Sequence, residues 1–254
     1  MNVKSICTAL AAAVILPLAA TPAGTTPLKV ACIGDSITFG HLLPGVATNS
    51  YPAQLNRMLK AKHPGEYDVR GFGDSGRGVY LDTIRNAKTG EKRGYRHHRR
   101  HAAALKWKPD VVICNLGVND TSEFPKEFTG ERPAGQFVRE YLELLDDYRK
   151  ANPKVKFYVW TKLAPLADSH KYAAERKTGR MEQALEEVAA KAGATPIDMF
   201  TPFGGTVKGR FHRDGIHPNI AGATCIAEAT LKVLEEQPTG DAAPAFSETP
   251  IRRR

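Results

Sequence analysis

Residues 28–40 read LKVACIGDSITFG, a short apolar run that ends abruptly at a glycine, an aspartate and a serine. An apolar run bounded by a turn is typical of a strand buried on both faces of a parallel sheet. A serine at the carboxyl end of such a strand, here Ser36, lies at the edge where α/β proteins bind ligands. Its hydroxyl is then exposed beside the backbone amides of the next helix, which suit a developing oxyanion. The structural alternative is an ordinary Ser or Asp helix cap.

Strand and helix patterns alternate along the rest of the chain, and we find no internal repeat. This alternation predicts an α/β protein, an open parallel sheet with helices on both faces. Right-handed crossovers then bring the ends of the strands to one edge of the sheet. Besides the strand in residues 28–40, we expect strands at 67–72, 110–116, 155–161 and 195–199, and helices at 51–62, 96–107, 137–150, 172–191 and 219–236.

The two ends of the chain differ from its middle. Lys4, the apolar run 6–20 and the small residues that follow predict a signal peptide over residues 1–23, and hence a secreted or periplasmic protein. The apolar run is too short for a stable membrane anchor. A cytosolic protein with an apolar N-terminal arm is the alternative. Residues 27–236 form one domain, and residues 237–254, rich in Pro, Ala, Thr and Ser, are expected to be a flexible tail.

Charge and cysteine content narrow the class of partner. The formal net charge of +9 suits a polyanion. Because a secretory signal argues against nucleic acid, we favour an acidic polysaccharide or an anionic cell surface. Loss of Cys7 with the signal leaves Cys32, Cys114 and Cys225, an odd number that cannot all pair within the chain. We expect buried free thiols, and their spacing resembles no metal site.

Two glycine-containing turns follow the second and third predicted strands. Residues 71–76 read GFGDSG, and glycines there let the backbone approach a ligand closely, so that the amide of Gly73 can serve as a donor. Residues 116–120 read LGVND, and the side-chain amide of Asn119 can donate a hydrogen bond at the same edge. A turn requiring positive φ and an Asn-Asp helix cap are the respective structural alternatives.

Residues 213–219 read RDGIHPN and open the last predicted helix. An aspartate three residues before a histidine, Asp214 and His217, can hold the imidazole in one tautomer. The imidazole can then act as a base toward a serine hydroxyl. A structural turn with an exposed histidine, or a metal site, are the alternatives for this stretch alone.

Together these stretches resemble the four sequence blocks of the SGNH (GDSL) hydrolase family, in the same order. The matching residues are GDS at 34–36, Gly73, the pattern Gly-x-Asn at 117–119 and the pattern Asp-x-x-His at 214–217. The resemblance implies a three-layer α/β/α sandwich whose five parallel strands are ordered 2-1-3-4-5. One departure is visible, because many members carry Asn where this chain has Gly71.

The resemblance also implies a role for each matching residue. Ser36 is the nucleophile, His217 the general base, and Asp214 the acid that orients it. The oxyanion hole consists of the backbone amides of Ser36 and Gly73 and the side chain of Asn119. The mechanism so implied needs no metal and no cofactor.

Within the family, residues 67–73, 108–113 and 214–219 are similar to the bacterial carbohydrate acetylesterases, including sialate O-acetylesterase-like proteins. This similarity implies hydrolysis of O-acetyl or other short acyl esters on carbohydrate. The predicted loops near the motifs are mostly polar and glycine-rich, which suits a sugar better than a long acyl chain. A lysophospholipase or general short-chain acyl esterase is the alternative enzyme. A glycan-binding protein that has lost turnover is the alternative outside enzymes.

One basic run precedes the third predicted strand. It is either a solvated helix face or a surface that grips a carboxylated or sulfated glycan. Its members are Lys92, Arg93, Arg96, His97, His98, Arg99, Arg100 and His101.

Overall fold

The computed structural model describes residues 26–82 and 88–236. The predicted signal peptide over residues 1–23 and the predicted tail over residues 237–254 lie outside the described residues. In the described ranges, no helix combines the length and the apolar character needed to cross a membrane.

A five-stranded parallel sheet forms the centre of the molecule, in the order β2-β1-β3-β4-β5. The predicted fold class and strand order are therefore confirmed. Every residue of β3 is buried, as are the last five residues of β1, because helices cover both faces of the sheet. The strands are β1 Leu28–Gly34, β2 Tyr67–Gly71, β3 Val111–Asn115, β4 Lys156–Lys162 and β5 Thr195–Asp198.

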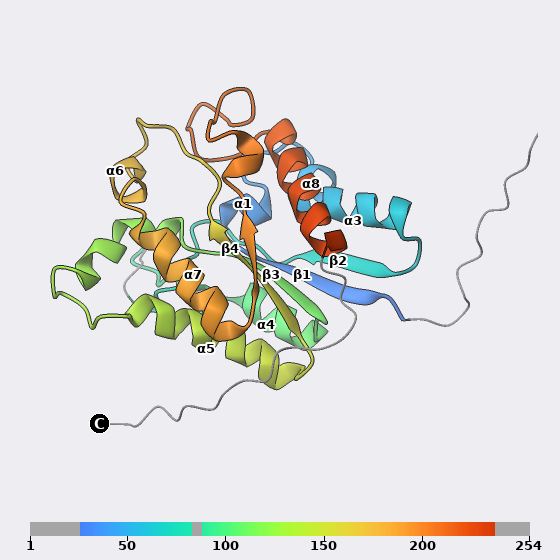
Figure 1. The fold of residues 1–254 in the computed structure, drawn as a ribbon, viewed down its shortest axis with the longest axis horizontal. Helices are drawn as coiled ribbons and strands as arrows, with labels where there is room; N and C mark the ends of the chain where they lie inside the picture. Colours follow the sequence, from blue (N-terminus) through green and yellow to red (C-terminus); the bar gives the residue numbers. More distant parts are fainter. Residues whose placement is uncertain (1–25, 83–87, 237–254) are drawn as a thin grey trace, which may run out of the picture.

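The helices make two layers around this sheet. Figure 1 shows α3 and α8 packed together on one face, and α4, α5 and α7 on the other. The short helix α1 follows β1 directly and begins at Ser36. The helices are α1 Ser36–Phe39, α2 Val46–Asn49, α3 Tyr51–Lys62, α4 Arg99–Trp107, α5 Gln136–Ala151, α6 Ala173–Arg176, α7 Arg180–Ala192 and α8 Ile220–Glu236.

The single helix predicted over residues 172–191 is wrong. The structure has two helices, α6 and α7, separated by a turn at 177–179. Gly179 adopts a φ of +71°, which ends the regular helical path. The Thr178 hydroxyl also donates a 2.7 Å hydrogen bond to the Glu175 carbonyl, an acceptor that a continuous helix would use.

The helix predicted over residues 96–107 begins later, at Arg99. A 3₁₀ turn covers Tyr95–His97, and His98 is extended with a ψ of 148°. The buried Tyr95 anchors this turn, because its hydroxyl donates a 2.8 Å hydrogen bond to the carbonyl of Phe72, next to the Gly73 turn.

The three cysteines in the described part of the chain are buried and free, as predicted. Burial raises the pKa of Cys32 and of Cys114 to about 12, although hydrogen bonds to tyrosine hydroxyls oppose the shift. Neither thiol therefore ionises at neutral pH.

Candidate active site

Ser36 lies at a sharp turn between β1 and α1. The Asp35 side chain caps α1 by accepting a 2.9 Å hydrogen bond from the amide of Ile37. Gly34 leaves no room for a side chain, because an added Cβ would lie 2.4 Å from the carbonyl oxygen of Asn115. The turn thus places the hydroxyl of Ser36 at the carboxyl edge of the sheet, with the residue 9% exposed.

His217 and Asp214 reach the same edge from the loop before α8. The Nε2 atom of His217 lies 2.9 Å from Oγ of Ser36, and its Nδ1 atom lies 2.7 Å from Oδ2 of Asp214. The other carboxylate oxygen of Asp214 accepts 3.1 Å hydrogen bonds from the amides of Ile216 and His217. Serine, histidine and aspartate therefore form one hydrogen-bonded chain, although Ser36 and His217 are 181 positions apart.

The pKa of Asp214 indicates where the proton of the His217 ring lies. Partial burial raises the pKa of Asp214, but the hydrogen bonds from the His217 ring and from two backbone amides outweigh burial and hold the pKa below its ordinary value. Asp214 is therefore a carboxylate, and it accepts a hydrogen bond from Nδ1–H of His217. The Nε2 atom is left with a lone pair, which accepts the hydrogen bond of the Ser36 hydroxyl.

Gly73 lies in the turn after β2, packed against α1. An added Cβ would lie 2.5 Å from the amide nitrogen of Phe39 and 2.7 Å from the carbonyl carbon of Thr38, so only glycine fits. Within the described residues, the Gly73 amide has no hydrogen-bond partner. It is free to donate to a ligand at this edge.

Asn119 follows β3 and faces the same turn. Its side-chain nitrogen donates a 2.9 Å hydrogen bond to the carbonyl of Arg77 and lies 3.5 Å from Oδ2 of Asp35. The first contact fixes the orientation of the amide, and the second is too long to occupy the remaining N–H firmly. The structure thus brings all five predicted site residues to one edge of the sheet.

Two buried carboxyls beneath the site escaped the sequence analysis. Asp35 and Asp120 are fully buried, and Asp120 accepts hydrogen bonds of 2.8 and 3.0 Å from the amides of Val79 and Tyr80. Burial raises the pKa of each carboxyl to about 7. Both belong to the quoted motifs, but nothing in the sequence distinguishes a buried aspartate from an exposed cap.

The sequence analysis also did not identify His41 as a neighbour of the site. Its exposed ring packs edge-on against the ring of His217, with centroids 4.7 Å apart. Partial burial, together with the neighbouring His217, lowers the pKa of His41. A neutral His41 therefore supports the imidazole of His217 without adding a charge beside it.

Among residues 26–82 and 88–236, no three His, Cys, Asp or Glu side chains are grouped so that they could hold a metal ion. The expectation that hydrolysis needs no metal and no cofactor stays a prediction.

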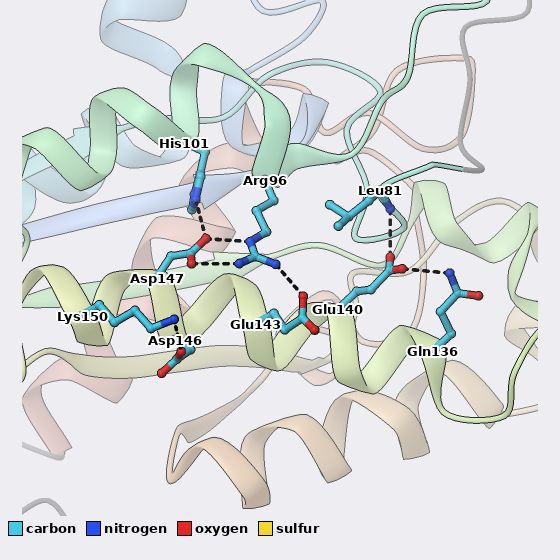
Figure 2. A network of polar contacts seen from close by, with 9 residues as sticks. All are labelled: Leu81, Arg96, His101, Gln136, Glu140, Glu143, Asp146, Asp147 and Lys150. Atoms are coloured by element: carbon cyan, nitrogen blue, oxygen red, sulfur yellow. Dashed lines mark hydrogen bonds and ion pairs between the residues drawn. The ribbon is translucent and has the colours of Figure 1, made fainter. Parts of the chain in front are cut away.

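The basic run is divided between structural and free side chains. Figure 2 shows Arg96 and His101 turned toward α5. The Arg96 guanidinium contacts both carboxylate oxygens of Asp147 at 2.7 and 3.0 Å and Glu143 at 2.5 Å, while His101 lies 3.2 Å from Asp147.

Lys92 and His98 pair with other carboxylates. Within the described residues, the side chains of Arg93, His97, Arg99 and Arg100 have no ion-pair partner.

A doubly covered parallel sheet with these four motifs at its carboxyl edge is the arrangement expected of an SGNH hydrolase. The chain belongs to the GDSL-like lipase/acylhydrolase family, whose model matches residues 32–225. The predicted family is therefore confirmed.

The chain also resembles individual proteins whose names state an activity. The chain is 30% identical, over 226 residues, to an acetylxylan esterase of Xylanibacter ruminicola. The match covers 82% of this chain but only 43% of that relative's length. Among solved structures, the acetyl xylan esterase AlAXEase superposes with a TM-score of 0.60 at 22% identity, covering 82% of this chain and 100% of that one. TesA superposes with a TM-score of 0.58 at 23% identity, covering 82% and 98%. These two likenesses concern the fold.

Proposed function

We propose that this protein is a serine esterase that hydrolyses O-acetyl and other short acyl esters on carbohydrate. The observation that carries the proposal is the hydrogen-bonded chain from Ser36 through His217 to Asp214. Such a chain activates a hydroxyl that is otherwise a weak nucleophile.

The geometry suits an acyl-enzyme mechanism. Nε2 of His217 takes the proton of Ser36 as Oγ attacks the ester carbonyl, and Asp214 stabilises the imidazolium that forms. The carbonyl oxygen becomes an oxyanion that accepts hydrogen bonds from the amides of Ser36 and Gly73 and the side chain of Asn119. His217 then protonates the departing sugar oxygen. Water, activated by the same imidazole, releases the acid and restores Ser36.

Two observations favour a carbohydrate ester over a long-chain lipid. The curated relative is an acetylxylan esterase, although this chain spans less than half of its length. A hollow of about 370 Å³ is lined in part by the turn that begins at Asn119, and the hydroxyls and charged groups of its lining can hydrogen-bond a sugar. It is lined by Thr121, Ser122, Pro125, Lys171, Tyr172, Ala174 and Glu175.

The test compares ester substrates for the wild type and Ser36→Ala. The substrates are p-nitrophenyl acetate, butyrate and octanoate, together with acetylated xylan, acetylated pectin and O-acetylated sialic acid. We expect acetate to be preferred, and Ser36→Ala to lose about three orders of magnitude or more in kcat with its thermal unfolding little changed. Thr230→Ala, which removes a buried hydroxyl on α8 that donates to the carbonyl of Ile226, is the matched control and should stay active.

Each other outcome has a definite meaning. A preference for octanoate would support the alternative, a lysophospholipase or general acyl esterase. Binding of a glycan without acetate release would support a non-catalytic binding protein. Full activity of Ser36→Ala would overturn the proposal.

We also propose that the protein is exported and that anionic glycans are among its substrates. The support for export is the signal-like pattern of residues 1–23. Protein recovered outside the cytoplasm should begin after residue 20 or 23, which N-terminal sequencing would detect. A full-length N-terminus would contradict export.

A further inference from the structure

A groove of about 530 Å³ lies at the edge of the sheet, along the edge strand β2. One end is formed by Thr38 and Phe39, which follow Ser36 on α1, and by Gly73. The groove then continues between α3 and β2 to the start of α4. The polar side chains of the lining that bear on its chemistry are Thr48, Ser50, Asn56, Arg57, Arg70 and Arg100.

Three arginines from three different elements meet in this groove. Arg57 comes from α3, Arg70 from β2 and Arg100 from α4, and Figure 1 shows α3 and α4 on opposite faces of the sheet. No lining residue is acidic. Asp68, outside the lining, pairs with Arg70 at 2.9 Å. The groove is therefore strongly positive and incompletely neutralised.

Arg100 is the arginine with the most unused hydrogen-bonding capacity. Its Nε atom is buried and has no hydrogen-bond partner, and its guanidinium makes no ion pair within the described residues. Arg57 is bonded to the carbonyl oxygen of Thr48, a neutral acceptor that leaves its charge uncompensated. A buried donor without an acceptor is unfavourable, and an anion in the groove would supply the acceptor.

We propose that this groove is a subsite for an anionic sugar residue, a carboxylate- or sulfate-bearing unit of the glycan whose ester is cleaved at Ser36. The inference rests on the proposed function, and it names the class of glycan. Planar guanidiniums bind carboxylate or sulfate oxygens through paired N–H donors, a geometry that lysine cannot offer. The hydroxyls of Thr48 and Ser50 and the amide of Asn56 are neutral partners for sugar hydroxyls.

The position of the groove links it to the ester site. The lining residues Thr38 and Phe39 belong to the same short helix as Ser36, and Gly73 is shared with the proposed oxyanion hole. A chain with its acetylated unit at Ser36 can extend past the Gly73 turn toward Arg100. The basic run therefore contributes to substrate binding mainly through Arg100, because Arg96 and His101 are held by α5.

The first test measures binding without catalysis. Isothermal titration calorimetry with unacetylated trigalacturonate should give a Kd that rises roughly tenfold in Arg100→Gln and further in Arg57→Gln/Arg100→Gln. The matched control is Arg99→Gln. Arg99 carries the same charge and is the neighbouring residue, but its side chain is exposed and lies outside the groove, so this variant should keep the wild-type Kd. Xylotriose, a neutral trisaccharide, tests whether the anion is required.

Several results would overturn the subsite. They are an unchanged Kd in the double variant, an equal loss in Arg99→Gln, or xylotriose binding as tightly as trigalacturonate. Sodium sulfate that displaces trigalacturonate with an inhibition constant equal to the trigalacturonate Kd would also overturn the subsite, because the sugar would then contribute nothing to binding. Circular dichroism and thermal unfolding of each variant check that the fold is retained.

The second test separates this inference from the proposed function. The ratio of kcat/KM for acetylated pectin to that for acetylated xylan should fall roughly tenfold in Arg100→Gln and stay unchanged in Arg99→Gln. Arg100-dependent binding of trigalacturonate by a protein that cleaves no ester would keep the subsite and overturn the esterase. Ester cleavage with no preference for the acidic glycan would keep the esterase and overturn the subsite.

Discussion

Asn119 shows how one side chain can be held in place and still have a donor to spare. Its amide is anchored on the carbonyl of Arg77 at 2.9 Å, while its contact with Asp35 is 3.5 Å long. An anchored amide costs little reorganisation when charge develops nearby, which is the condition for an effective oxyanion donor.

We therefore expect Asn119→Ala to lower kcat on p-nitrophenyl acetate by roughly 10²- to 10³-fold with little change in KM. The matched control is Asn152→Ala, because the Asn152 amide also donates a 2.9 Å hydrogen bond to a carbonyl, that of Pro109. That variant should lose stability but keep kcat. A raised KM with unchanged kcat would mean that Asn119 contacts the ester only in the ground state.

The five residues that the structure brings to one edge could be singled out in the sequence, because each has a distinct chemical type at a strand end or a helix start. What Asp35, Asp120 and His41 do could not be found in this way. Their behaviour depends on which groups surround them, and those groups come from distant parts of the chain. The amides of Val79 and Tyr80, for example, bind Asp120 from about 40 residues away.

Among the elements, the 3₁₀ turn Tyr95–His97 and the following helix α4 are joined to α5 by ion pairs drawn in Figure 2. The Arg96 guanidinium meets both carboxylate oxygens of Asp147, with the two side chains only 25% and 20% exposed. Paired geometry and partial burial make this contact stronger than an ordinary surface ion pair. The Lys150–Asp146 pair on the same helix is far more exposed, at 70% and 45%.

Arg96→Gln should therefore lower the free energy of unfolding at pH 7 by about 1–3 kcal/mol. Lys150→Gln, the matched control, should lower it much less, because solvent screens an exposed ion pair. Urea unfolding followed by circular dichroism measures both. Equal effects would show that the paired contact adds nothing beyond surface charge.

Element boundaries were predicted best where apolar spacing and turn chemistry agree. The predicted helix 51–62 coincides with α3, and the strand patterns give all five strands. The helix predicted at 172–191 failed because Thr178 and Gly179 interrupt a stretch whose apolar spacing looked continuous. Gly and Thr lower helix propensity only modestly, so local sequence alone did not require a break there.

At the scale of the whole molecule, the buried carboxyls of Asp35 and Asp120 make stability depend on pH. Burial raises the pKa of each to about 7, from an ordinary aspartate value of 3.8. Between these values the folded protein holds a proton that the unfolded chain has released. The stability that each carboxyl contributes is therefore greatest in acid and falls as the pH rises from about 4 to about 7.

The corresponding variant is Asp120→Asn, which keeps an oxygen acceptor for the two amides and removes the titration. The free energy of unfolding of the wild type, minus that of Asp120→Asn, should fall by roughly 2–4 kcal/mol between pH 4 and pH 7. Urea unfolding at several pH values measures this difference. The exposed Asp146→Asn serves as the control. A difference that stays constant, or that rises with pH, would contradict the shift.

The hydrogen bond between Ser36 and His217 joins positions 181 apart, and the intervening chain supplies four of the five strands. Closing so long a loop is entropically costly, so this contact is expected to be among the last to form. During translation, Ser36 is incorporated long before His217. The proposed catalytic hydrogen-bonded chain is therefore complete only after residue 217 has been synthesised, and a shorter nascent chain cannot act through it.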